Sequence, residues 1–92
     1  GNVVAPQEVM AQSGADILEV TLPVDAPLVG TRVGEVVWPT DTVLAAIVRD
    51  TSPIAPSPDD TLEAGDELLI VAGRDADHDD LHALLVTPRA TT

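Results

Sequence analysis

The side chains best suited to chemistry in this sequence are two histidines near its C-terminal end. His78 and His82 stand four residues apart, so on a helix both would lie on one face, which is the spacing of paired zinc ligands. A pair of histidines needs a third ligand, and Asp79 stands where the helical metalloprotease motif carries glutamate. We keep His78 and His82 as candidate metal ligands, beside the simpler interpretation of a solvated acidic helix.

The acidic run around these histidines has the alternating aspartates of a calcium loop. Counted from Asp75, the sixth position lacks the glycine that such a loop needs, and the twelfth falls at Val86 instead of an acid. Aspartates in the first turn of a helix are stabilised by the helix dipole, which explains Asp77, Asp79 and Asp80 without a metal. A calcium loop is therefore not expected.

Other motifs that carry catalysis are missing from the sequence. Gly30 and Gly34 are not followed by the Gly-Lys-Ser/Thr of a phosphate-binding loop, and neither histidine stands in a nucleophile motif. The chain has no cysteine, which excludes disulfides and cysteine-ligated zinc. We therefore expect a protein that is not an enzyme and that acts through interaction.

Apolar patterns predict the strands that must position these residues. Residues 17–23 alternate between apolar and polar, which is the pattern of a half-buried strand. Residues 42–49 and 67–72 are apolar on both faces, as in a central strand or in a strand with one face on a second subunit. The short segment 54–55 is bounded by prolines and is expected at a sheet edge.

Two helices are expected to accompany these strands. Apolar residues at 29, 33, 36 and 37 predict a short helix that ends at Trp38-Pro39. A last helix is expected from about 76 to 85, with Asp75 as its cap and Leu81, Leu84 and Leu85 buried. The predicted fold is α+β, with a small sheet of about four strands and two helices on one face.

Charge and length limit the partners of the chain. Its 92 residues carry 16 acidic side chains against 4 arginines, a formal net charge of −12. Such a surface repels phosphate backbones and anionic lipids, so neither nucleic-acid binding nor direct membrane insertion is expected. A domain this short has a small core, and strands that are apolar on both faces predict a homodimer.

Several segments, in this order, are similar to a known family. Residues 17–23 (ILEVTLP) and 28–36 (LVGTRVGEV) are followed by residues 43–49 and then by 62–73 (LEAGDELLIVAG). Together they resemble the C-terminal domain of regulators of potassium conductance, the RCK_C or TrkA-C family. The resemblance implies a dimeric α+β regulatory domain over 17–86, preceded by a linker or short lead-in helix over 1–16 and followed by a polar tail over 87–92.

The resemblance also implies a function. It implies a cytoplasmic ligand-sensing domain that regulates a potassium channel, a potassium uptake system or a cation–proton antiporter. Its partners would be a membrane transporter or channel subunit and an upstream Rossmann domain. The alternative is a ligand-free dimerisation module of a larger protein.

The ligand site that the resemblance implies lies at the start of the second predicted strand. Its candidate residues are Thr42, Val43 and Leu44, with Arg49 as the nearby cation. Members that bind cyclic di-AMP carry an Asp-x-Arg pair and an asparagine before the aliphatic pair; here Thr42 replaces the asparagine and the arginine is missing. With a net charge of −12, this argues against cyclic di-AMP. A nucleotide and a cation both stay open as effectors, and no cofactor is required. If the effector is a cation, the candidate ligands are the carboxylates of Asp41, Asp59, Asp60 and Asp66. The alternative is that these aspartates are simply polar residues of surface turns.

Overall fold

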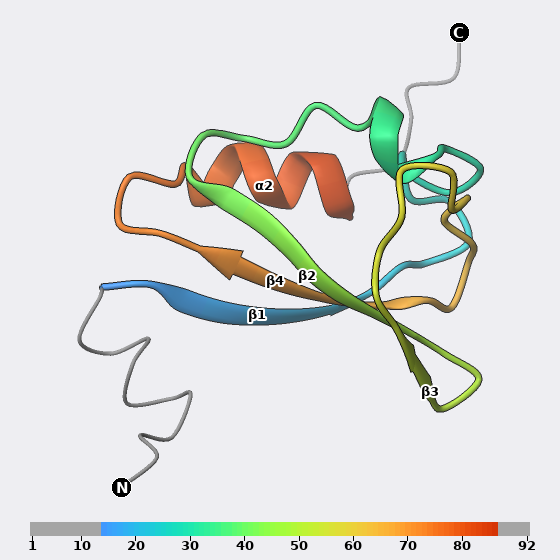
Figure 1. Ribbon diagram of the computed structural model, residues 1–92. Coiled ribbons are helices and arrows are strands. Elements are labelled where there is room, and N and C mark those ends of the chain that lie inside the picture. Colours follow the sequence, from blue (N-terminus) through green and yellow to red (C-terminus); the bar gives the residue numbers. More distant parts are fainter. Residues whose placement is uncertain (1–13, 87–92) are drawn as a thin grey trace, which may run out of the picture.

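The structure, a computed structural model, describes residues 14–86. Its elements in chain order are β1 (Asp16–Thr21), the 3-10 helix η1 (Val33–Glu35), β2 (Thr42–Arg49), β3 (Ser52–Ile54), β4 (Glu67–Ala72) and α2 (His78–Leu85) (Figure 1). Within these residues, a four-stranded sheet with one α-helix confirms the predicted α+β class. Most of the expected lead-in segment and the tail over 87–92 lie outside the described residues.

The sheet is antiparallel throughout, with the strand order β1-β4-β2-β3. β2 and β4 are the central strands, as their two-sided apolar pattern predicts. β1 and β3 form the edges, and the predicted edge segment begins two residues early, at Ser52. A bulge between Leu44 and Ala46 shifts the register of β2 against β4.

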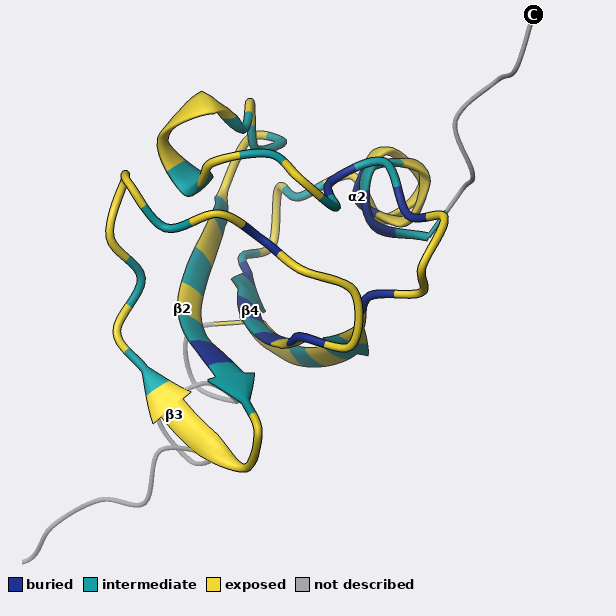
Figure 2. Cartoon of the chain, turned by 90° about the vertical axis from the view of Figure 1, so that its right-hand side faces the viewer, coloured by how far each residue is buried: buried dark blue, intermediate teal, exposed yellow. Residues whose placement is uncertain are grey.

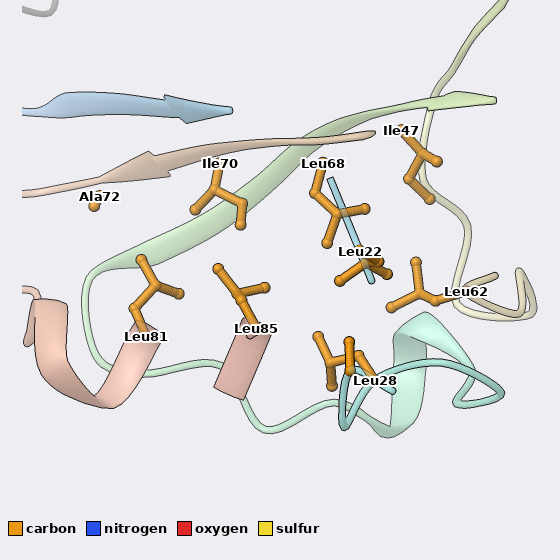
Figure 3. Close-up of a cluster of buried hydrophobic side chains, with 10 residues drawn as sticks. Leu22, Leu28, Ile47, Leu62, Leu68, Ile70, Ala72, Leu81 and Leu85 are labelled. Carbon is orange, nitrogen blue, oxygen red and sulfur yellow. The ribbon is translucent and has the colours of Figure 1, made fainter. Parts of the chain in front are cut away.

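The core lies between the sheet and α2 (Figure 3). Leu68 and Ile70 of β4 face Leu81 and Leu85 of α2, and each of these four side chains is at most 2% exposed. Loop residues close the far end of this cluster: Leu22, Leu28 and Leu62. Each buried leucine or isoleucine contributes on the order of 2 kcal/mol, so this one layer holds α2 on the sheet.

The prediction of a helix that ends at Trp38 is wrong. Only η1 forms there, because three N–H groups of this segment donate to the loop that precedes β4, and its internal bonds are short turns such as that from Val36 to Val33. The N–H groups of Gly30, Val33 and Gly34 donate to the carbonyls of Leu62, Asp60 and Pro58 at 2.8–2.9 Å. Gly30 has φ +87°, and a side chain at Gly34 would collide with Pro58. Both glycines therefore suit this pairing of loops, whereas neither favours a helix.

The last helix begins later than predicted, and its cap is a different aspartate. One carboxylate oxygen of Asp77, Oδ1, accepts hydrogen bonds from the N–H groups of Asp79 at 2.9 Å and Asp80 at 3.1 Å. Asp75 lies outside the helix, in the turn before it. The prediction of Asp75 as the cap is thus wrong by two residues. An aspartate still caps the helix, because its carboxylate accepts the free N–H groups of the first turn.

The face of the sheet that points away from α2 is open. We call it the outer sheet face: Ile17, Glu19, Thr21, Val43, Ala46, Val48, Glu67, Leu69 and Val71. Figure 1 shows α2 and η1 on the opposite side. Ile17 is 40% exposed and Val43 61%. Intermediate and exposed residues alternate along the first half of β2 in Figure 2, and the strand is buried or intermediate from Ala46 onward. Within residues 14–86 no helix combines the length and the apolar content that crossing a bilayer demands.

Candidate functional site

A hollow of about 450 Å³ lies where β2 begins and β4 ends. The antiparallel register brings these ends together, because Thr42 pairs with Ala72 and Val43 with Val71. We call this site the β2–β4 hollow, and its lining residues are Ala15, Asp41, Val43, Val71, Gly73, Arg74 and Asp75. Its apolar floor is therefore continuous with the outer sheet face.

Asp41 connects the turn before β2 to the turn after β4, and both turns border the β2–β4 hollow. Its carbonyl accepts the N–H of Gly73 at 2.8 Å, and its Oδ2 accepts the N–H of Asp75 at 3.1 Å. Asp41 has φ 60°, a conformation that aspartate tolerates better than most residues. A side chain at position 73 would collide with the Asp41 carboxylate, so the glycine there is needed for this contact. The rim of the hollow is thus held by one backbone–backbone hydrogen bond and one hydrogen bond from backbone to side chain, between residues 32 and 34 apart in sequence.

Arg74 supplies the cation of the β2–β4 hollow. Its guanidinium lies over Gly14, where an added Cβ would approach Nε and Nη2 to 3.2 Å. Among residues 14–86 Arg74 forms no ion pair, whereas Arg32 pairs with Glu35 and Arg49 pairs with Asp66. The hollow therefore combines an apolar floor, one arginine without a carboxylate partner in the described part, and carboxylates at its rim. Such a site can hold a flat or apolar group and contact polar groups of either sign.

The structure separates the four ligand-site residues expected from the sequence. Only Val43 lines the β2–β4 hollow, because Thr42 and Leu44 point to the other face of the sheet. Leu44 packs against the core there. Arg49 lies at the opposite end of β2. The sequence reasoning missed Arg74, although pairing the two apolar strands antiparallel would have placed the residue after Gly73 near the start of the strand over 42–49.

Arg49 is engaged in an ion pair with the buried Asp66. Its Nε and Nη2 donate to the two Asp66 oxygens at 2.8 Å each, and Nη1 lies 2.6 Å from Glu63 Oε2. The side chain of Asp66 is 2% exposed. The hydrogen bonds from Arg49 lower the pKa of the Asp66 carboxyl against the opposing effect of burial, and the Glu63 N–H lowers it further. Arg49 thus joins β2 to the turn before β4.

The carboxylates proposed for a cation do not converge on one place in the described part of the chain. Asp60 accepts the N–H of Ser57 at 2.9 Å, and Asp66 holds Arg49. Asp59 lies in the same turn as Asp60, and Asp41 lies at the β2–β4 hollow. These four residues are therefore divided among three places.

The two histidines lie on the exposed side of α2, in a second groove beside β1. Nε2 of His78 is 3.7 Å from Oδ2 of Asp16, and both side chains are more than half exposed. Within 14–86 no three histidine, aspartate or glutamate side chains are grouped so that they could hold a metal ion. The pair therefore has no third protein ligand within that range.

The sequence of this chain is similar to a known family and to two curated proteins. Residues 17–82 match the TrkA-C domain family. Two curated relatives, each named Trk system potassium uptake protein TrkA, come from Mycobacterium tuberculosis strains CDC 1551 / Oshkosh and ATCC 25618 / H37Rv. Each is 40% identical over 65 residues, which cover 71% of this chain. The match spans only 30% of the length of those relatives.

A solved structure described as an RCK domain with cda has a similar fold. The two superpose with a TM-score of 0.62 over 75% of this chain and 96% of the other, at 20% sequence identity. At this identity the likeness concerns the fold alone. It agrees with the four-stranded antiparallel sheet and single α-helix described above.

Proposed function

The chain belongs to the TrkA-C domain family, and on this premise we propose that it is a regulatory domain that dimerises and senses a ligand for a potassium transport system. The name of the 40% identical relatives, a potassium uptake protein, supports the transport context. The partner would be a membrane transporter or channel subunit, with a Rossmann domain upstream in the whole protein. The domain would act on the cytoplasmic side and catalyse no reaction.

One observation carries this proposal: the β2–β4 hollow opens beside an uncovered apolar sheet face. Val43 and Val71 belong to both surfaces, so a second copy docked on the outer sheet face would border the hollow. A ligand bound there would contact both copies or change how they fit. Binding and dimer geometry would then be coupled, which is the physical requirement for ligand-controlled regulation.

The side chains of the β2–β4 hollow favour a ligand with both polar and apolar parts. Arg74 can bind a phosphate, the carboxylates of Asp41 and Asp75 can bind a cation or an amino group, and Val43 and Val71 suit a flat ring. A nucleotide or a cation therefore remains the effector class. Thr42 and Leu44 flank this site through the backbone of β2, and we assign the cationic role to Arg74 in place of Arg49.

Calorimetric titration with cyclic di-AMP, ATP, ADP, NAD and divalent cations tests ligand sensing. We expect at least one of them to bind. If it is a nucleotide, Arg74→Ala should weaken it about tenfold, the loss of one charge-assisted hydrogen bond. Arg32→Ala is the matched control, because Arg32 is equally an exposed arginine but is paired with Glu35 outside the hollow.

The second candidate function is a ligand-free dimerisation module of a larger protein. The same open sheet face supports it, since dimerisation needs no ligand. If every ligand in the titration fails to bind while the chain remains dimeric, this second function replaces the first.

A further inference from the structure

The two edges of the sheet differ in how they are protected. β3 has three residues, includes Pro53 and is followed by two more prolines, so it offers few backbone donors to another strand. β1 has six residues, no proline and an unbroken register against β4. Within residues 14–86 it pairs with β4 alone. An antiparallel edge strand directs alternate N–H and C=O groups outward, so β1 can accept a further strand.

A groove of about 470 Å³ follows this open edge, between β1 and α2. Its lining includes the four consecutive residues 17–20 of β1, which point alternately to the two faces of the sheet. The groove therefore lies against the edge of the strand and not over one face. We call it the β1–α2 groove.

The floor of the β1–α2 groove is apolar and its polar groups lie at the rim. Leu81 and Leu85 are 1% and 2% exposed, and Leu18 and Val20 are partly buried beside them. The other lining residues of α2 are polar or lie at its end: His78, Asp79, His82 and Val86. A strand laid against β1 would direct every second side chain onto this floor.

We propose that the β1–α2 groove binds an extended, basic segment of a partner protein, which adds to β1 as a fifth strand. Addition of a peptide to a sheet edge combines backbone hydrogen bonds with pockets for alternate side chains, and an adjacent helix supplies one wall of those pockets. The six residues of β1 set the length of the segment at about six residues. This proposal does not depend on the ligand-sensing function.

Charge identifies the occupant as basic. The groove is lined by Glu19 and Asp79, and its lining includes no arginine or lysine. Oδ2 of Asp16 lies 3.7 Å from Nε2 of His78, which belongs to the lining. The chain as a whole carries a net charge of −12. Arginine or lysine at the solvent-facing positions of the segment would meet this field favourably, whereas a second copy of the chain would bring the same negative charge.

Backbone NMR of the 92-residue chain with synthetic octapeptides tests the proposal. The probe alternates valine and arginine, one control alternates valine and glutamate, and another places proline at two central positions of the basic probe. We expect saturable shifts of β1 and α2 amides with the basic probe, at least tenfold weaker binding of the acidic peptide and none of the proline peptide. No shift in β1 at about 1 mM basic probe, or equal binding of the proline peptide, overturns the proposal.

Two neighbouring aspartates of α2 provide a matched pair of variants. Asp79 lines the β1–α2 groove, whereas Asp80 lines a hollow on the other side of the helix. Both are exposed and both donate their N–H to Asp77, so Asp79→Lys and Asp80→Lys should alter the helix alike. Asp79→Lys should weaken the basic probe about fivefold, and Asp80→Lys less than twofold. Equal effects would show non-specific attraction and overturn the proposal.

Two observations on the peptide-free chain would assign the groove to another occupant. Nuclear Overhauser contacts from residues 87–92 to Leu18 or Leu81 would show that the chain fills its own groove. Shifts of the α2 amides of His78, Asp79 and His82 on dilution, with no peptide present, would show that a second copy binds there, because these residues line the groove and lie away from the outer sheet face. Either result overturns the proposal, and neither bears on ligand binding at the β2–β4 hollow.

Discussion

The ion pair between Arg49 and Asp66 joins the end of β2 to the turn before β4. Both carboxylate oxygens of Asp66 accept hydrogen bonds from Arg49, and Nη2 of Arg49 also donates to the carbonyl of Thr61 at 3.0 Å. These contacts link residues 12 and 17 apart in sequence, so no local pattern predicts them. The sequence alone therefore suggests Arg49 only as a cation near the expected ligand site.

Removal of the Arg49 guanidinium should destabilise the fold. Arg49→Met keeps much of the side-chain volume but leaves the Asp66 carboxylate buried without its cation. We expect the free energy of unfolding to fall by about 2 kcal/mol, below the cost of breaking a fully buried pair because Arg49 is 30% exposed. Urea denaturation measures this change, with Arg32→Met, at an exposed pair, expected within about 0.5 kcal/mol of wild type.

The pH dependence of stability should also report on Asp66. Its pKa in the folded state lies below the ordinary value of 3.8. The stabilisation that this shift supplies is therefore fully present above about pH 5 and is lost as the pH falls through the folded-state pKa. Urea denaturation between about pH 5 and pH 2 should show a smaller loss of stability for Asp66→Asn than for wild type. Parallel curves for the two proteins would contradict the assignment.

At the scale of elements, the sequence predicts the positions of the strands better than it predicts the structure of the segments that connect them. The alternation in β1 and the two-sided apolar runs of β2 and β4 predict their positions and the central place of the last two. The segment around η1 has helical apolar spacing, but its N–H groups bond to a loop that lies about 30 residues later in sequence. Pairing at this separation is a tertiary effect that a local pattern does not contain.

The N-terminus of α2 offers a test of the helix boundary. Asp77→Ala removes the side chain that accepts the N–H groups of Asp79 and Asp80, so it should destabilise the domain by about 1 kcal/mol. Asp75→Ala, at the neighbouring aspartate outside the helix, should cost less than half as much. Thermal denaturation followed by circular dichroism compares the stability of the two variants. A larger loss of stability for Asp75→Ala would show that Asp75 is the cap, as expected from the sequence.

At the scale of the whole molecule, one layer of core leaves the sheet with one covered face and one open face. The core residues lie on the α2 side, whereas Val43 on the outer sheet face is 61% exposed. A domain of 92 residues has little core of its own, and an apolar sheet face of this kind is typical of a protein–protein interface. The sequence predicted a shared face, but the place of the β2–β4 hollow beside it required the strand order.

Sedimentation equilibrium of the wild-type chain and two valine variants tests this dimer face most directly. Val43→Asp places a charge on the outer sheet face, while Val37→Asp, at a valine that is 87% exposed and away from the sheet, is the matched control. We predict a mass of twice 9.5 kDa for wild type and for Val37→Asp, and 9.5 kDa for Val43→Asp. A wild-type chain that remains at 9.5 kDa at about millimolar concentration, or a Val43→Asp variant that dimerises as well as wild type, would contradict the account.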